Sequence, residues 1–418
     1  MHATRFILFL TLILALNQAG RAQDIPILDE AYLSSKIYSF ELKDQEISGE
    51  GAQFLKQKIT NSQYFMIGEF HGSPQLSNFT AALIPFFQAT KYNAFACEVG
   101  PHSAQLLQQL MNKPNKAVEQ LKAFNQKYYL KEVEGEPIPF FDAVEDAQFL
   151  GLISQASMPI WGLDQEYYYS FFHLNDQLLK LVKGNPSFAK LEQQKKEVDA
   201  LVLEWLIKED EDEEGFPVFS KILAEPLVQA YFAHFESIPE GKAILTDLKI
   251  SWDIYDRYQS GSHSDRVAYI RQNFKEAHDE MLKSGQQPKV LIKIGGAHAS
   301  KQNYYGTFDV GALVNDMAVE NGFQFTNLNF DQRYIQKNGE LIDLLEKYPS
   351  RNARIEIFLR FARPEQGTIF DFKAIRQDLM TNKVKLPENG YSLYWKKLIY
   401  GYDAYVILPT DYSNTPNY

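Results

Sequence analysis

The sequence contains a single cysteine among its 418 residues, so no disulfide can form within one chain and the fold must rely on its core. It also lacks an excess of positive charge, because Asp and Glu outnumber Lys and Arg by 53 to 42 and the formal net charge is −11. An acidic surface repels phosphate backbones, which argues against nucleic acid as a partner.

Hydrophobic residues make up 45% of the chain, aromatic residues 14% and charged residues 23%. This composition can bury a sizeable core, and it excludes a disordered, collagenous or repeat-array protein. At roughly 100–200 residues per domain, the length fits two or three domains, or one large α/β domain with an insertion.

No apolar run reaches the roughly 20 residues that a membrane span requires. The apolar stretch at residues 6–16 follows Arg5 and precedes the small residues Gly20 and Ala22, which is typical of a secretory signal. We therefore expect removal of residues 1–22, a mature net charge of −13, and export to the periplasm or the extracellular space. Without a cysteine at the cleavage point, we expect no lipid anchor and no membrane anchor after signal removal.

Several common catalytic motifs are missing: the Gly-x-Ser-x-Gly elbow, the glycine-rich phosphate loop and the His-Glu-x-x-His metal helix. Cys97 lies within an apolar run, which favours a core position over a nucleophilic role.

Four short apolar runs each end in a polar residue, a pattern typical of buried strands. They comprise residues 64–68 before Glu69, 94–97 before Glu98, 159–163 before Asp164, and 290–294 before the Gly-Gly-Ala-His sequence that ends at His298. Helical patterns at residues 76–90 and 103–111 lie between them. The alternation predicts an α/β fold with a largely parallel sheet flanked by helices. Further strand candidates are residues 323–330, 355–360 and 404–408.

From about residue 167 to 262 the pattern changes to amphipathic helices without a strand signal. We predict a helical insertion there that could cover a cleft, between two halves of the α/β domain at residues 23–166 and 263–418. The acidic run at residues 209–214 is interpreted as a solvated loop or helix end. A calcium site is the weaker alternative, because the EF-hand spacing is absent.

The polar residues after the strands are the candidate site. The carboxyl ends of parallel strands meet at one rim of a sheet, where ligands usually bind. A histidine polarised by a carboxylate can act as general base on water, and a second histidine with an arginine can stabilise an oxyanion. The residues expected at the rim are Glu69, His71, Glu98, Asp164 and His298.

Each of these residues also has a structural interpretation. Glu69 and Asp164 could cap the following helices, and His71 and His298 could be structural histidines. Glu98 ends a strongly apolar run, so a buried carboxylate there needs a partner or a role. The remaining histidines that we weighed, expected to be surface or helix residues, are His102, His173, His234 and His278.

These motifs resemble the erythromycin esterase-like family, which belongs to a superfamily with the ChaN-like and TIKI-like proteins. The resemblance covers about residues 64–408, with its motifs in order. It rests on Gly68-Glu69-Phe70-His71-Gly72, Cys97-Glu98, Trp161-Gly162-Leu163-Asp164-Gln165, Asp265-Arg266 before the strand that leads to His298, and Tyr402-Asp403-Ala404-Tyr405-Val406.

The resemblance implies His71 as the base on water, Glu69 and Glu98 as the carboxylates that orient it, and His298 with Arg266 completing the site. Asp164 and Gln165 would then bind substrate. Members with known activity open a macrolide lactone without a metal.

This sequence departs from the family pattern at three places. One residue, not two, separates Glu69 from His71, which is closer to the ChaN-like spacing. Gly295 stands where the esterases often carry a further histidine, and the helix after Arg266 lacks a clean Met-Ala-x-x-Asn run. These departures argue against a macrolide as the substrate. They leave the core hydrolytic chemistry in place.

We therefore expect an exported hydrolase that acts on an ester or lactone of a small molecule, with no cofactor and no metal. The alternatives are a ChaN-like haem- or iron-binding protein and a TIKI-like metal-dependent hydrolase that uses His71, His298 and a glutamate. A Soret band would identify the haem binder, and metal analysis would identify the metallohydrolase.

Overall fold

The computed structural model describes residues 25–211, 217–303 and 306–418. The predicted signal at residues 1–22 and the end of the acidic run at 212–214 lie outside the described residues. Glu209 and Asp210 are the last residues of a helix, as expected for that part of the run. Among the described residues, no helix is both long enough and apolar enough to cross a membrane.

The described chain forms one large sheet with the strand order β2-β1-β10-β11-β7-β3-β6-β4-β5. From β11 to β5 every pairing is parallel, whereas the pairings among β2, β1, β10 and β11 are antiparallel. The strands are β1 (Ile37–Lys43), β2 (Glu46–Ser48), β3 (Tyr64–Glu69), β4 (Ala94–Cys97), β5 (Ile160–Gly162), β6 (Val290–Gly295), β7 (Phe325–Gln332), β10 (Gly367–Phe370) and β11 (Ala404–Leu408).

Helices cover both faces of this sheet. Alternate residues of its strands point to opposite sides, so each face carries apolar side chains that the helices bury. In β3, Phe65 and Ile67 enter one apolar core while Tyr64 and Met66 enter the other. The first core is covered by α3 (Glu50–Asn61), α4 (Pro74–Ala89), α5 (Pro101–Leu110), α6 (Ala117–Tyr128) and α7 (Val144–Gln155). The second is covered by α13 (His263–Lys283), α14 (Val310–Glu320), α17 (Glu356–Leu359), α18 (Phe372–Met380) and α19 (Ser392–Gly401). The predicted α/β class is confirmed.

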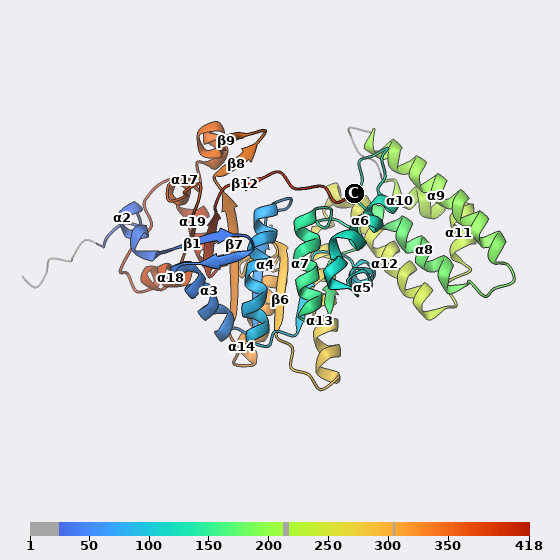
Figure 1. The fold of residues 1–418 in the computed structure, drawn as a ribbon, viewed down its shortest axis with the longest axis horizontal. Coiled ribbons are helices and arrows are strands. Elements are labelled where there is room, and N and C mark those ends of the chain that lie inside the picture. The colour runs from blue at the N-terminus through green and yellow to red at the C-terminus, as the bar shows by residue number, and fades with distance from the viewer. Residues whose placement is uncertain (1–24, 212–216, 304–305) are drawn as a thin grey trace, which may run out of the picture.

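Between β5 and α13 the described residues are helical, and they pack around a third apolar cluster that includes Phe171, Leu248 and Trp252. Figure 1 shows these helices gathered at one end of the molecule. The division of the chain at residues 167 and 262 remains a prediction. The helices are α8 (Phe171–Leu181), α9 (Phe188–Asp210), α10 (Phe219–Ala224), α11 (Pro226–Phe232) and α12 (Pro239–Asp256).

The remaining elements lie outside this plan. They include a small sheet with the order β12-β8-β9, three α-helices of four residues each, and short 3-10 helices at residues 34–36, 114–116, 168–170 and 258–260. The strands and α-helices among these elements are β8 (Tyr334–Lys337), β9 (Glu340–Asp343), β12 (Asp411–Tyr412), α2 (Glu30–Leu33), α15 (Leu344–Lys347) and α16 (Pro349–Asn352).

One strand prediction is wrong, since residues 355–360 form helix α17 and its flanks. The buried side chains are Ile355, Phe358 and Leu359, spaced three and one residues apart, which places them on one helical face. The strands predicted at residues 323–330 and 404–408 are β7 and β11.

Candidate functional site

The site lies where three neighbouring parallel strands end. Strand β6 pairs with β3 on one side and with β4 on the other, and Glu69 is in register with Gly295. Glu98 follows β4 directly. Glu69 and Glu98 are buried, at 7% and 4% exposure, and buried carboxylates require compensation.

Two histidines lie at this rim, and each has a carboxylate near its Nδ1 atom. Nδ1 of His71 lies 3.6 Å from Oε1 of Glu69, and Nδ1 of His298 lies 2.7 Å from Oδ2 of Asp309. Nε2 of His298 is 3.6 Å from Oε1 of Glu98. His71 sits in the turn between β3 and α4, where Gly72 has a φ of +75°. A carboxylate at Nδ1 leaves Nε2 available for chemistry.

Gly295 marks the point on which these side chains converge. A Cβ atom placed on it would lie 3.0 Å from Oε2 of Glu98, 3.3 Å from Nε2 of His71 and 3.6 Å from Cδ2 of His298. A side chain here would press on all three groups. The absence of a third histidine at this position therefore has a steric consequence, because it keeps the centre of the site open.

A buried lysine and a partly buried arginine compensate the carboxylates. Nζ of Lys293 contacts Oε2 of Glu69. Arg266 donates to Glu98 at 2.8 Å and to both oxygens of Asp164 at 3.0 and 2.5 Å. The guanidinium is thus committed to two carboxylates, which makes it a group that positions Glu98.

These contacts shift the pKa values in opposite directions for acids and bases. Burial would raise the pKa of Glu69, but Lys293 and His71 outweigh it and the pKa is lowered. Likewise, Arg266 overcomes burial and lowers the pKa of Asp164. Burial would lower the pKa of His298, but Asp309 and Glu98 raise it above the ordinary value. The site therefore favours ionised forms of Glu69 and Asp164 and a charged His298.

The described structure thus brings together Glu69, His71, Glu98, His298 and Arg266, with Asp164 linked through Arg266. The buried Gln165 adjoins Asp164, and its side chain approaches Tyr255. The helix-cap alternatives are wrong: Ser73 caps α4, so Glu69 does not, and no helix begins directly after Asp164.

Among the other histidines, His234 is exposed in a turn. His102, His173 and His278 are helical as expected, but they are buried, at 8%, 1% and 4% exposure. Of the two alternatives, the helical one therefore holds for these three, and each lies on the packed side of its helix. Cys97 is buried at 2% exposure, as predicted.

Sequence reasoning missed Lys293, Asp309 and Phe140. Lys293 had a signal, because it is the one charged residue in an otherwise apolar run at 290–294. Asp309 had none, since it caps α14 eleven residues after His298. Phe140 stacks on the His71 ring at 3.9 Å between centroids, and its φ of +66° is unusual for a bulky residue. Strained backbone of this kind is concentrated at functional sites.

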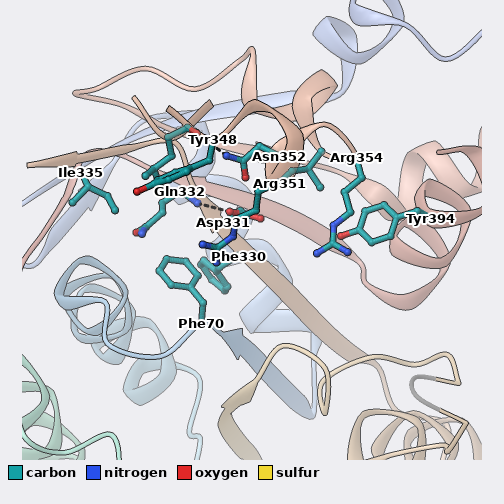
Figure 2. Close-up of a pocket in the computed structure, with 12 residues that line it drawn as sticks. Phe70, Phe330, Asp331, Gln332, Ile335, Tyr348, Arg351, Asn352, Arg354 and Tyr394 are labelled. Atoms are coloured by element: carbon teal, nitrogen blue, oxygen red, sulfur yellow. Dashed lines mark hydrogen bonds between the residues drawn. The ribbon is translucent and has the colours of Figure 1, made fainter. Parts of the chain in front are cut away.

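Two adjoining pockets extend from the site. One of about 440 Å³ is lined by Glu69, Phe70, Asn329 and Lys397, among others. The next, of about 370 Å³, shares Phe70, Phe330, Arg354 and Tyr394 with the first and is drawn in Figure 2. Phe70 lies between Glu69 and His71 in the sequence, so it joins both pockets to the rim.

The carboxylates also form a possible set of metal ligands. Glu69, His71 and Glu98 each offer one ligand atom, and these atoms lie within 4.8 Å of one another. However, Lys293 and Arg266 contact the same two carboxylates. Fixed positive charges at that range oppose binding of a cation.

Comparison with known proteins identifies the fold. No protein-family model matches the sequence, and no curated protein matches it significantly. A variant of erythromycin esterase EreC in its open conformation is similar in structure, with a TM-score of 0.54 and 12% identity over 90% of this chain and 98% of that one.

Two further solved structures are similar over most of the chain. A Bacillus cereus protein has a TM-score of 0.54 and 14% identity, covering 93% of this chain and 98% of its own. A succinoglycan biosynthesis protein has a TM-score of 0.52 and 13% identity, covering 92% and 97%. The chain therefore has the fold of the erythromycin esterase-like proteins over nearly its whole length.

Proposed function

We propose that the protein is an exported hydrolase that cleaves an ester or lactone with a water molecule activated by His71. The observation that supports this best is the pair of histidine–carboxylate contacts around Gly295. His71 and His298 approach one point from two strands, and each has a carboxylate near its Nδ1 atom. The similarity in fold to an esterase agrees with this chemistry.

In the proposed reaction, Nε2 of His71 accepts a proton from water while the water oxygen attacks the carbonyl carbon. Glu69 stabilises the imidazolium that forms, because its own carboxylate stays ionised beside Lys293. A charged His298 donates a hydrogen bond to the oxyanion of the tetrahedral intermediate. The bond to the leaving oxygen then breaks, and the proton held on His71 passes to that oxygen, giving an acid and an alcohol.

Phe140 and the two cations would keep this arrangement fixed. Phe140 covers one face of the His71 ring, which limits rotation of an otherwise exposed side chain. Arg266 forms ion pairs with Glu98 and Asp164, and so it acts as a positioning residue.

A screen of ester and lactone substrates with the wild type and His71→Ala tests the proposal. His71 is 40% exposed, so its truncation should leave the fold intact while hydrolysis falls by orders of magnitude. His234→Ala, in an exposed turn, is the matched control. Equal rates for the wild type and His71→Ala on every hydrolysed substrate would exclude His71 as the base.

A metal-dependent hydrolase is the second candidate, supported by the Glu69, His71 and Glu98 group. Zinc requires ligands at about 2.0–2.2 Å from one point. To bind it, Glu69 and Glu98 would have to lose their contacts with Lys293 and Arg266. The donor set therefore favours the metal-free reaction. Activity that is lost to a chelator and restored by one metal ion would reverse that preference.

A further inference from the structure

The pocket beside Glu69 and the pocket that adjoins it form a continuous groove with an unusual charge. We define the groove by the residues that both pockets share, which are Phe70, Phe330, Arg354 and Tyr394. Lys397 lines the end nearer Glu69, and Arg351 lines the end farther from it. The groove thus begins beside Glu69 and is lined along its length by both aromatic and cationic side chains.

The cations of the groove have no carboxylate of their own. Among the described residues, none of Arg351, Arg354 and Lys397 forms an ion pair within 4.0 Å. In the same structure five arginines outside the groove form such pairs, whereas Arg271 and Arg363 contact backbone carbonyls instead; the paired ones are Arg257, Arg266, Arg333, Arg360 and Arg376. Three unpaired cations around one groove contrast with a protein whose net charge is −11.

Two carboxylates line the groove, and both are already engaged: Glu69 contacts Lys293, and the oxygens of Asp331 accept two hydrogen bonds. Tyr405 donates to Asp331 at 2.9 Å, and the backbone N–H of Gln332 donates at 2.9 Å. Burial raises its pKa, and Arg354 and Arg351 only partly offset that effect. Asp331 therefore leaves positive charge in excess along the groove.

The aromatic residues fix the position of this charge. The guanidinium of Arg354 lies 4.8 Å from the ring centre of Tyr394, a cation–π contact that Figure 2 shows at one end of the pocket. Phe70 and Phe330 line the same shared stretch of the groove as that guanidinium. A ligand in the groove therefore meets apolar and cationic surface side by side.

We propose that the groove binds the acyl part of the substrate and that this part carries a carboxylate. This inference rests on the proposed hydrolase function and names its substrate class: an ester or lactone with an alkyl or aryl segment and an anionic end. The alkyl or aryl segment packs on Phe70 and Phe330, and the carboxylate is held by Arg354, Arg351 or Lys397. Arginine can bind a carboxylate through two parallel hydrogen bonds, which favours it for this role.

Two esters that differ only in charge test the proposal. Mono-p-nitrophenyl adipate ends in a carboxylate, and methyl p-nitrophenyl adipate carries the same chain with that group methylated. For the wild type we expect kcat/KM to be roughly tenfold or more in favour of the monoacid, the gain from one charge-assisted contact. The preference should arise mainly from KM and should weaken at high salt. A series from succinate to suberate would locate the anion along the groove.

Variants separate the groove from the general charge of the surface. Arg351→Gln and Arg354→Gln should each reduce the ratio between the two esters, and the double variant should bring it near unity. Arg360→Gln is the matched control, because Arg360 is exposed and paired with Glu30 and Glu356 outside the groove. Equal hydrolysis of both esters by the wild type, or an equal loss of ratio in Arg360→Gln, would overturn the proposal.

A binding measurement keeps this test distinct from the test of hydrolysis. Calorimetric titration with monoethyl adipate and diethyl adipate needs no turnover. If neither p-nitrophenyl ester is cleaved, the proposed hydrolysis of such esters fails, while binding of the monoacid that is lost in Arg351→Gln, Arg354→Gln would still support the anionic groove. The absence of any difference in binding between the two adipates would refute the groove by itself.

Discussion

Replacing Lys293 with methionine would remove a cation from beneath the site while keeping an unbranched side chain. Lys293 and Glu69 are buried, with side-chain exposures of 3% and 5%, and they are in contact. The same ammonium acts on Asp146, a carboxyl whose pKa burial raises to about 7 even though Lys293 opposes that shift. Without Lys293, two buried carboxyl groups lose their compensating charge.

The expected cost follows from the contact itself. Removing one partner of a buried ion pair destabilises a protein by about 3–5 kcal/mol. With an unfolding entropy of about 2.1 cal/mol/K per residue, this corresponds to a loss of about 3–6 °C in Tm for a chain of this length. Lys208→Met is the matched control, since Lys208 pairs with Glu204 at 48% and 66% exposure, and exposed pairs contribute little.

The sign of the pH dependence gives a sharper test. In the wild type the pKa of Glu69 is lowered, so its contribution to stability is present above the ordinary pKa near 4.5 and is lost as the pH falls through the folded-state value. In Lys293→Met the largest effect that lowers this pKa is gone, and burial should outweigh the remaining His71 contact and raise it, so stability should fall as the pH rises above about 4.5. The variant should therefore lose more stability at pH 7 than at pH 5.

Thermal unfolding at both pH values, followed by calorimetry, measures this difference. The double variant Lys293→Met with Glu69→Gln removes both charges and should recover much of the lost stability, because no carboxylate is then left unpaired beside the site. A Lys293→Met protein that unfolds like the wild type at pH 7, or a double variant no more stable than Lys293→Met, would refute the reasoning.

Three further outcomes are expected. Asp309→Asn keeps the cap of α14 but removes the charge that raises the pKa of His298, so stability should fall more at pH 6 than at pH 9, because a raised histidine pKa stabilises below about 6.5 and is lost as the pH rises. Equal losses at both pH values, measured by denaturant titration, would argue against a charged His298. Prolonged dialysis against chelator should leave hydrolysis unchanged, with metal content followed by elemental analysis. Iodoacetamide should label Cys97 only after unfolding, because the thiol is buried and its pKa is strongly raised; mass spectrometry of the native protein would detect any earlier labelling.

The parallel half of the sheet could be predicted because its strands are short, apolar and followed by polar residues. The run at 94–97 became β4 without change, and the polar residues after β3, β4 and β6 met at one rim as the parallel arrangement requires. The antiparallel edge was missed for the opposite reason. Strand β1 is only partly buried, and β10 begins with Gly367 and Thr368, so neither gives a continuous apolar signal.

The partners of the site residues were harder to predict than the residues themselves. Glu98 ends an apolar strand, and that position alone required a partner, but which cation supplied it depended on how α13 packs across the sheet to deliver Arg266. Asp309 is a helix cap by its local sequence, and only the tertiary structure turns its second oxygen toward His298. Residues 355–360 were misread because a short apolar run suits either a strand or one buried turn of helix.

The pairing of β3 with β6 has a consequence for the order in which the protein folds. This pairing joins residues more than 200 positions apart in the chain, and Glu69 meets Gly295 only when it is complete. Contacts between such distant segments form slowly, because the chain loses the conformational entropy of a long loop before the contacts can stabilise it. Helices such as α9 form locally and need no such closure. During refolding from denaturant, the helical circular dichroism signal should therefore return before hydrolysis does, and recovery of activity should report the last long-range step of assembly.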